Sequence, residues 1–169
     1  RFSLATEIEG LAVPTGSEHE DEPHELICNV LKFMPREGNG NGRSQVPAYF
    51  LENAEYYEKR SNIYGYADDA ARWALLCRGV LEFIRASKDW VPDEIVANDW
   101  QTGFHISDLH TRDKGDERLK RIATVFIVHN LFYQGIFDHR FTAEMDYDDG
   151  HSPLPSFFDP RLLKINGMR

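Results

Sequence analysis

Two residues with acid–base side chains follow strand-like segments of this chain. Asp99 comes shortly after residues 94–97, and His129 comes directly after residues 122–128. In parallel α/β sheets, ligands bind beyond the carboxyl ends of the strands, so both side chains are expected at one edge of the sheet, within about 10 Å of each other. A carboxylate and an imidazole placed together can bind polar groups and move protons. The alternative is that Asp and Asn end strands because they form turns.

Other polar residues have a simpler interpretation. His105 and His110 are five residues apart, and helical metal pairs are usually four apart, so a solvated helix surface is favoured for them and for Asp108. No phosphate-binding loop, dinucleotide-binding loop or nucleophile elbow is present. A group of tyrosines is expected to be packed, or, if exposed, to stack on sugar rings: Tyr56, Tyr57, Tyr64 and Tyr66.

Alternating strand and helix signals predict the elements that position these residues. Helical spacing of apolar residues predicts a helix over residues 68–85 and another over 101–110. Residues 26–33 and 46–51 are expected to be strands, with an Asn-Gly-rich turn at 39–42 between them. The unbroken apolar segments at 94–97 and 122–128 indicate parallel strands covered on both faces. The fold class is therefore α/β, with a mostly parallel, Rossmann-like sheet flanked by helices.

Composition excludes several classes of protein. The chain has 169 residues, 19 Lys and Arg against 28 Asp and Glu, and a net charge of −9, which disfavours nucleic acids and anionic membranes as partners. Its longest apolar run, 73–77, is far shorter than the roughly 20 residues that span a bilayer. Two cysteines and no visible signal peptide make a reduced, cytoplasmic setting the default.

Several motifs resemble the N-terminal lobe of bacterial glycogen synthases and plant starch synthases. They occur in the family's order and cover roughly residues 46 to 169: Tyr49-Phe50-Leu51-Glu52-Asn53, Tyr64-Gly65-Tyr66-Ala67-Asp68-Asp69, Asn98-Asp99-Trp100-Gln101-Thr102-Gly103, and Thr124-Val125-Phe126-Ile127-Val128-His129-Asn130-Leu131-Phe132-Tyr133-Gln134-Gly135. The resemblance implies a single, incomplete N-terminal lobe (1–169) of a GT-B glycosyltransferase. Such enzymes move glucose from ADP-glucose or UDP-glucose onto an α-1,4-glucan with retention of configuration, without a metal or other cofactor.

The resemblance also implies roles for matching residues. His129 would contact the transferred glucose and stabilise developing positive charge, and Asp99 would lie near the acceptor hydroxyl and that glucose. Tyr64 would stack on an acceptor glucose. Asn130 and Gln134 would shape the pocket.

The sequence departs from the family in ways that affect activity. The family's Lys-x-Gly-Gly-Leu loop and its C-terminal lobe, which supply most contacts to the donor diphosphate, are absent. The isolated chain is therefore expected to be inactive. Two alternatives are a non-catalytic glucan-binding or interaction module and a nucleotide-binding α/β regulator. Missing strands should also leave an exposed sheet edge through which copies of the chain self-associate.

Overall fold

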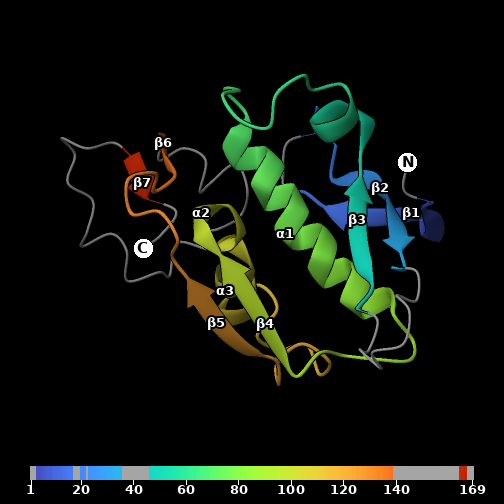
Figure 1. Ribbon diagram of the computed structural model, residues 1–169. Coiled ribbons are helices and arrows are strands. Elements are labelled where there is room, and N and C mark those ends of the chain that lie inside the picture. Colours follow the sequence, from blue (N-terminus) through green and yellow to red (C-terminus); the bar gives the residue numbers. More distant parts are fainter. Residues whose placement is uncertain (1–2, 17–19, 22, 36–45, 139–163, 167–169) are drawn as a thin grey trace.

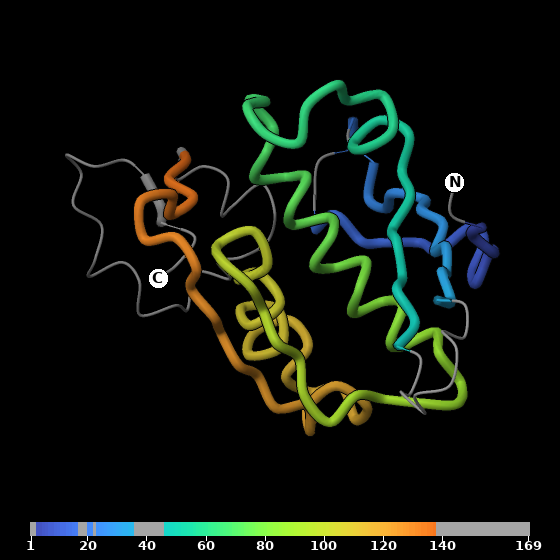
Figure 2. Tube along the Cα trace, viewed as in Figure 1, coloured from blue at the N-terminus to red at the C-terminus, as the bar shows by residue number. Residues whose placement is uncertain are grey.

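The computed structural model places one long helix between two groups of strands (Figure 1). It describes the chain over residues 3–16, 20–21, 23–35, 46–138 and 164–166. The helix α1 (Asp69–Ala86) confirms the expectation for residues 68–85. It runs diagonally through the view, with β1, β2 and β3 on one side and β4 and β5 on the other (Figure 2).

The first group is an antiparallel sheet of three strands in the order β1-β2-β3. These strands span Ala5–Pro14 (β1), Glu25–Phe33 (β2) and Ala48–Glu52 (β3). The antiparallel pair β2–β3 confirms the two predicted strands, and the turn expected at 39–42 lies outside the described residues. The strand β1 was not predicted from the sequence. Gly10, at a φ of +71°, and shifts in the register of β1 against β2 interrupt the alternation of side chains along this strand.

The second group is the parallel pair predicted from the two apolar segments. Here β4 (Glu94–Asn98) pairs with β5 (Ala123–Ile127), with Ile95 opposite Thr124 and Asn98 opposite Ile127. The α/β class is confirmed. The expectation of a mostly parallel sheet needs a correction for the described residues, where β4–β5 is the single parallel pair. A parallel pair needs a long crossover connection, such as residues 99–122 between β4 and β5, whereas consecutive strands such as β1 and β2 pair antiparallel.

The core lies on three sides of α1. One cluster joins Leu75 and Phe83 to the three-stranded sheet, and a second joins Leu81 and Ile84 to Ile122, just before β5. A third, at the helix N-terminus, contains Ala70, Ala74, Cys77 and Phe104. Burial on three sides explains why the helix has ten buried residues, and it fixes the two groups of strands relative to one another.

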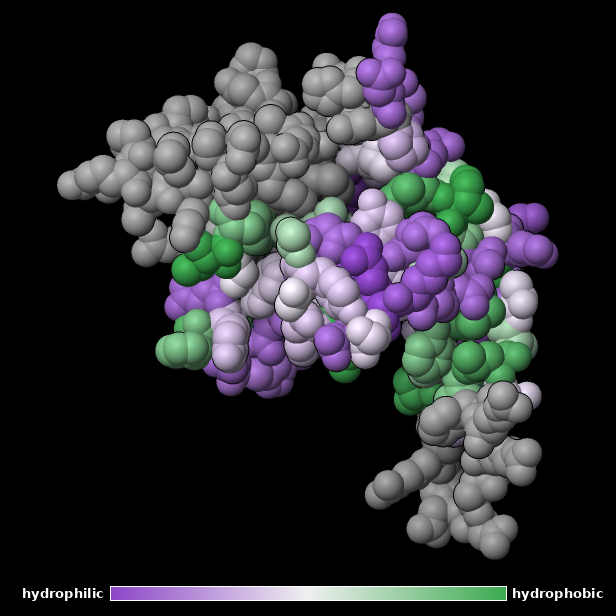
Figure 3. Space-filling view, turned by 90° about the horizontal axis from the view of Figure 1, so that it is seen from above, coloured by the Kyte–Doolittle hydropathy of each residue, from purple (hydrophilic) through white to green (hydrophobic). Residues whose placement is uncertain are grey.

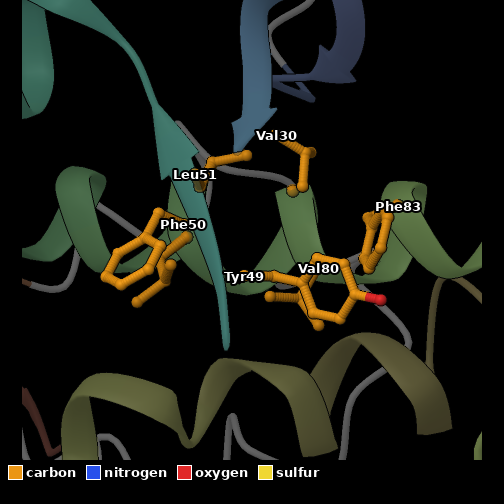
Figure 4. Close-up of a pocket in the computed structure, with 8 residues that line it drawn as sticks. Val30, Tyr49, Phe50, Leu51, Val80 and Phe83 are labelled. Carbon is orange, nitrogen blue, oxygen red and sulfur yellow. The ribbon is translucent and has the colours of Figure 1, made fainter. Parts of the chain in front are cut away.

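The crossing of α1 and β3 is unusually close at Gly79. A Cβ at this position would lie 2.5 Å from Leu51 Cδ2, so the strand approaches because the helix has no side chain there. A small open pocket borders this crossing, lined by residues that include Val30, Val80 and Phe83. Figure 4 shows Tyr49 and Phe50 on opposite sides of β3, as strand alternation requires.

The segment after β4 forms two short helices rather than the single helix expected over 101–110. The helix α2 (Asp99–Thr102) begins directly at the end of β4, and α3 (Phe104–His110) follows after Gly103. After β5 the chain forms β6 (Ile136–Asp138), which pairs antiparallel with β7 (Lys164–Asn166). Within the described residues no helix is both long and apolar enough to cross a membrane.

Candidate functional site

The parallel strands β4 and β5 run side by side, upward and to the left in Figure 1, and finish next to each other. Asp99 follows β4 directly, and His129 lies two residues after β5. Seen from above, the described surface of the molecule is a mixture of hydrophilic areas and separate hydrophobic patches (Figure 3). The expectation that Asp99 and His129 lie at the same edge of the parallel pair is therefore confirmed.

The carboxylate of Asp99 contacts the backbone of the segment after β5. Its Oδ1 accepts hydrogen bonds from the backbone N–H of His129, at 2.7 Å, and of Asn130, at 3.2 Å. Asp99 is the non-glycine residue with a positive φ (+56°) in the described chain. Asp tolerates this left-handed conformation better than most residues, and here it turns the chain sharply from strand into helix. Asp99 thus holds the end of β5 to the end of β4.

The ring of His129 has a different partner. Its Nε2 lies 2.9 Å from Oδ1 of Asn98, the last residue of β4, and the His129 side chain is otherwise exposed. If Asn98 Oδ1 accepts from the ring, Nε2 carries the proton and Nδ1 is an acceptor. The sequence alone assigned no role to Asn98. The parallel register, which places Asn98 opposite Ile127, is the signal that brings it to His129.

The loop 129–135, called the His129 loop here, is held by its own side chains. Asn130 Oδ1 accepts from the backbone N–H of Phe132 at 2.9 Å, and Gln134 Nε2 donates to the backbone carbonyl of Leu131 at 2.8 Å. The structure therefore places Asn130 and Gln134 as residues that shape the loop.

The far end of the His129 loop is fixed against α2. Gly135 has a φ of +64°, and a Cβ there would overlap the ring of Trp100. Trp100 in turn packs against Phe137, with ring centroids 6.1 Å apart. Glycine is required at this position both for its conformation and for the space occupied by the indole ring.

Tyr64 lies in a separate loop before α1. Its side chain is 58% exposed, and its ring centroid is 5.9 Å from that of Trp73 on α1. Buried Arg72 anchors this loop by donating to the carbonyl of Ile63 at 3.0 Å. Within the described residues no direct contact joins Tyr64 to His129. Instead, Trp73 and Trp100 belong to the same cluster around Phe104, which connects the two loops.

The polar residues after β3 have structural partners. Asn53 Oδ1 accepts from the backbone of a short π-helical turn (Ala54–Glu58), and Asn53 Nδ2 donates to the carbonyl of Ile27. Glu52 Oε2 accepts from Asn29 at 2.9 Å. The turn-forming alternative therefore applies to this strand end.

The expectation of a solvated helix surface is confirmed for His110, which is exposed, and is wrong for His105 and Asp108. His105 and Asp108 are buried, because α3 packs this face against α1. Burial lowers the pKa of His105 to about 4 and raises the pKa of Asp108 to about 6, although Arg78, at 3.7 Å, opposes the second shift. Among the residues that the structure describes, no group of three potential ligands could hold a metal ion.

The comparisons with known proteins agree with the sequence resemblance. A family model described as the starch synthase catalytic domain matches residues 12–168. The chain belongs to this family. Glycogen synthases from Desulforudis audaxviator and Moorella thermoacetica are 44% identical over 118 residues and 31% identical over 147 residues. These alignments cover 69% and 87% of the chain but only 23% and 28% of the relatives.

A solved structure confirms the fold of this starch synthase family member. The catalytic domain of starch synthase IV from Arabidopsis thaliana, bound to ADP and acarbose, matches with a TM-score of 0.71 at 17% identity. The match covers 98% of this chain and 31% of that one. The chain therefore has the α/β fold of part of a starch synthase catalytic domain, and it spans less than a third of the length of these proteins.

Proposed function

We propose that this chain is an incomplete N-terminal lobe of a retaining GT-B glucosyltransferase that extends α-1,4-glucan from ADP-glucose or UDP-glucose. The observation that carries the proposal is the pairing of Asp99 with the backbone of His129 at the ends of two parallel strands. This pairing fixes an exposed imidazole at the position where ligands of α/β sheets bind. Membership in the starch synthase catalytic domain family supports the same activity.

The two acid–base residues have different tasks in this proposal. His129 presents its ring, held by Asn98, to the transferred glucose, where a fixed dipole stabilises charge that develops in the transition state. Asp99 keeps His129 in place through Oδ1 and directs the rest of its carboxylate toward the acceptor hydroxyl and that glucose. Tyr64, exposed at the tip of its loop, stacks on an acceptor glucose.

The isolated chain is proposed to be inactive. Stabilisation of the departing nucleotide requires cations and oriented amides at the diphosphate, and the loss of one such donor typically lowers the rate by about 10²–10³. The segments that form the site, 98–103 and 129–138, contain no Lys or Arg. This composition also disfavours the alternative of a nucleotide-binding regulator, whereas a non-catalytic glucan-binding module remains the second candidate.

A hybrid enzyme tests the proposal. The glycogen synthase of Clostridium acetobutylicum is 43% identical to this chain over 100 residues, so that matching segment can be replaced by the sequence of this chain. We expect the hybrid to transfer glucose from ADP-glucose or UDP-glucose to glycogen, and the 169-residue chain alone to show no transfer. A folded hybrid, verified by its thermal unfolding, that transfers glucose from neither donor would contradict the proposal and favour the glucan-binding module.

A further inference from the structure

The His129 loop exposes two aromatic rings to solvent. The Phe132 side chain is 85% exposed and Tyr133 is 67% exposed, although a phenylalanine side chain normally gains free energy from burial. The two rings form an edge-to-face pair with centroids 5.2 Å apart and planes at 83°. Each ring therefore restricts the orientation of the other, and both remain available to a ligand.

The backbone beneath this pair is fixed on both sides. Before it, Asp99 binds the N–H of Asn130, and Asn130 binds the N–H of Phe132. After it, the Gln134 amide closes the turn onto Leu131, and Gly135 packs on Trp100. A loop that exposes aromatic rings while its backbone is held by side chains has already lost the conformational freedom that binding would otherwise cost.

The chemistry around the pair selects a neutral ligand with both apolar and polar surfaces. Because residues 98–103 and 129–138 include no Lys or Arg, nothing in them neutralises a phosphate. The polar groups of these segments include the His129 imidazole, the Asn98 amide and the Tyr133 hydroxyl. A pyranose fits this combination, since its C–H face packs on an aromatic ring while its hydroxyl groups bind amides and imidazoles at the edge.

We propose that the Phe132–Tyr133 pair is a stacking platform for a glucose unit of the acceptor glucan, next to the transferred glucose that His129 is proposed to contact. The platform is distinct from Tyr64, which lies in another loop, before α1. The proposal rests on the proposed function because it takes the glucan from that activity. It identifies a residue pair that determines where along the glucan chain the acceptor is held.

Maltoheptaose binding to the 169-residue chain, measured by isothermal titration calorimetry, tests this platform. We expect Phe132→Ala to weaken binding about tenfold, which is the effect of losing one stacking contact. Phe50→Ala is the control, because Phe50 is another exposed phenylalanine, at 49%, but lies on β3. Tyr133→Phe should retain binding, since it keeps the ring pair. The unfolding temperature of each variant is also measured, and agreement with that of the unmodified chain shows that a loss of binding does not come from a loss of folding.

The outcomes separate this platform from the proposed function. If Phe132→Ala binds maltoheptaose as the unmodified chain does, or if the unmodified chain does not bind it, the platform is wrong even where the hybrid enzyme transfers glucose. If Phe132→Ala instead changes only the sedimentation coefficient, the rings form a contact between copies of the chain, and the platform is again wrong. If binding depends on Phe132 and the hybrid is inactive, the stacking platform is supported and the proposed glucose transfer is contradicted.

Discussion

Asp99 binds the backbone of His129 rather than its ring: Asp99 Oδ1 accepts from the His129 N–H at 2.7 Å, while the imidazole Nε2 lies 2.9 Å from Asn98. Two consecutive residues at the end of β4 therefore hold the backbone and the ring of one histidine. The carboxylate fixes where the loop begins, and the amide fixes which way the ring points. This division explains how an exposed histidine on a loop can have a defined orientation.

The role of the Asp99 carboxylate is tested by two substitutions. Asp99→Ala removes both hydrogen bonds and places alanine at a φ of +56°, so we expect it to destabilise the chain by about 1–3 kcal/mol and to speed amide exchange at His129 and Asn130. Asp99→Asn keeps an acceptor and tolerates the conformation, and it should preserve most of the protection. Hydrogen exchange followed by NMR measures both. Equal exchange in the two variants would show that the carboxylate does not hold the loop.

Gly135 makes a second contact that the His129 loop requires. Gly135→Ala introduces a Cβ that overlaps the Trp100 ring at a φ of +64°, so we expect a loss of about 1–3 kcal/mol in the free energy of unfolding. Gly115→Ala is the control, since a Cβ at Gly115 meets nothing within 4 Å, and it should change stability by no more than about 0.5 kcal/mol. Urea denaturation compares them. Equal stability would mean that the loop moves away from Trp100 at little cost.

Sequence patterns predicted the elements whose signals are local. The apolar spacing over α1 and the unbroken segments of β4 and β5 each predicted an element that the structure contains, and their parallel pairing brought Asp99 to His129. The roles of those two residues remain predictions.

The structural features that the sequence did not predict depend on contacts between distant segments. Burial of His105 and Asp108 follows from the packing of α3 on α1, which no spacing within α3 reveals. The partner of the His129 ring follows from the register of two strands, and the requirement for Gly135 follows from a tryptophan 35 residues earlier in the chain. Tertiary packing determines these features, and local patterns carry little information about it.

The edge of β3 is the surface where self-association is proposed. Within the described residues β3 pairs with β2 alone, and Phe50 beside this edge is 49% exposed. An unpaired strand edge with an apolar side chain favours pairing with another chain. We expect Phe50→Lys to lower the weight-average mass in concentrated solution, as measured by sedimentation equilibrium. A chain that is monomeric before substitution would contradict this proposal.

Two buried titratable groups on α3 make opposite contributions to stability over the same range of pH. The pKa of Asp108 is raised to about 6 by burial, so its contribution is fully present below its unfolded value of 3.8 and is lost as pH rises through about 6. The pKa of His105 is lowered to about 4 by burial, so its contribution is present above 6.5 and is lost as pH falls through about 4.

Removing one of the two groups should therefore leave the dependence of stability on pH that the other group produces. Relative to the unmodified chain, Asp108→Asn should gain stability as pH rises from about 4 to about 6, and His105→Gln should lose stability as pH rises from about 4 to about 6.5. Chemical denaturation at a series of pH values measures the slopes. Curves of stability against pH that run parallel to the curve of the unmodified chain in both variants would contradict the opposite contributions of Asp108 and His105.

Steady-state kinetics of the hybrid enzyme test the proposed roles of His129 and Tyr64 separately. The His129 contact should strengthen as charge develops on the transferred glucose, so we expect His129→Ala to lower kcat far more than it weakens donor binding. Tyr64→Ala should raise the KM for glucan and spare donor affinity, because Tyr64 is proposed to contact the acceptor and not the donor. Asn98→Ala should lower kcat less than His129→Ala, because it frees the ring without removing it. A His129→Ala hybrid with an unchanged kcat would mean that this histidine is structural, and its exposed ring and polar partner would then need another explanation.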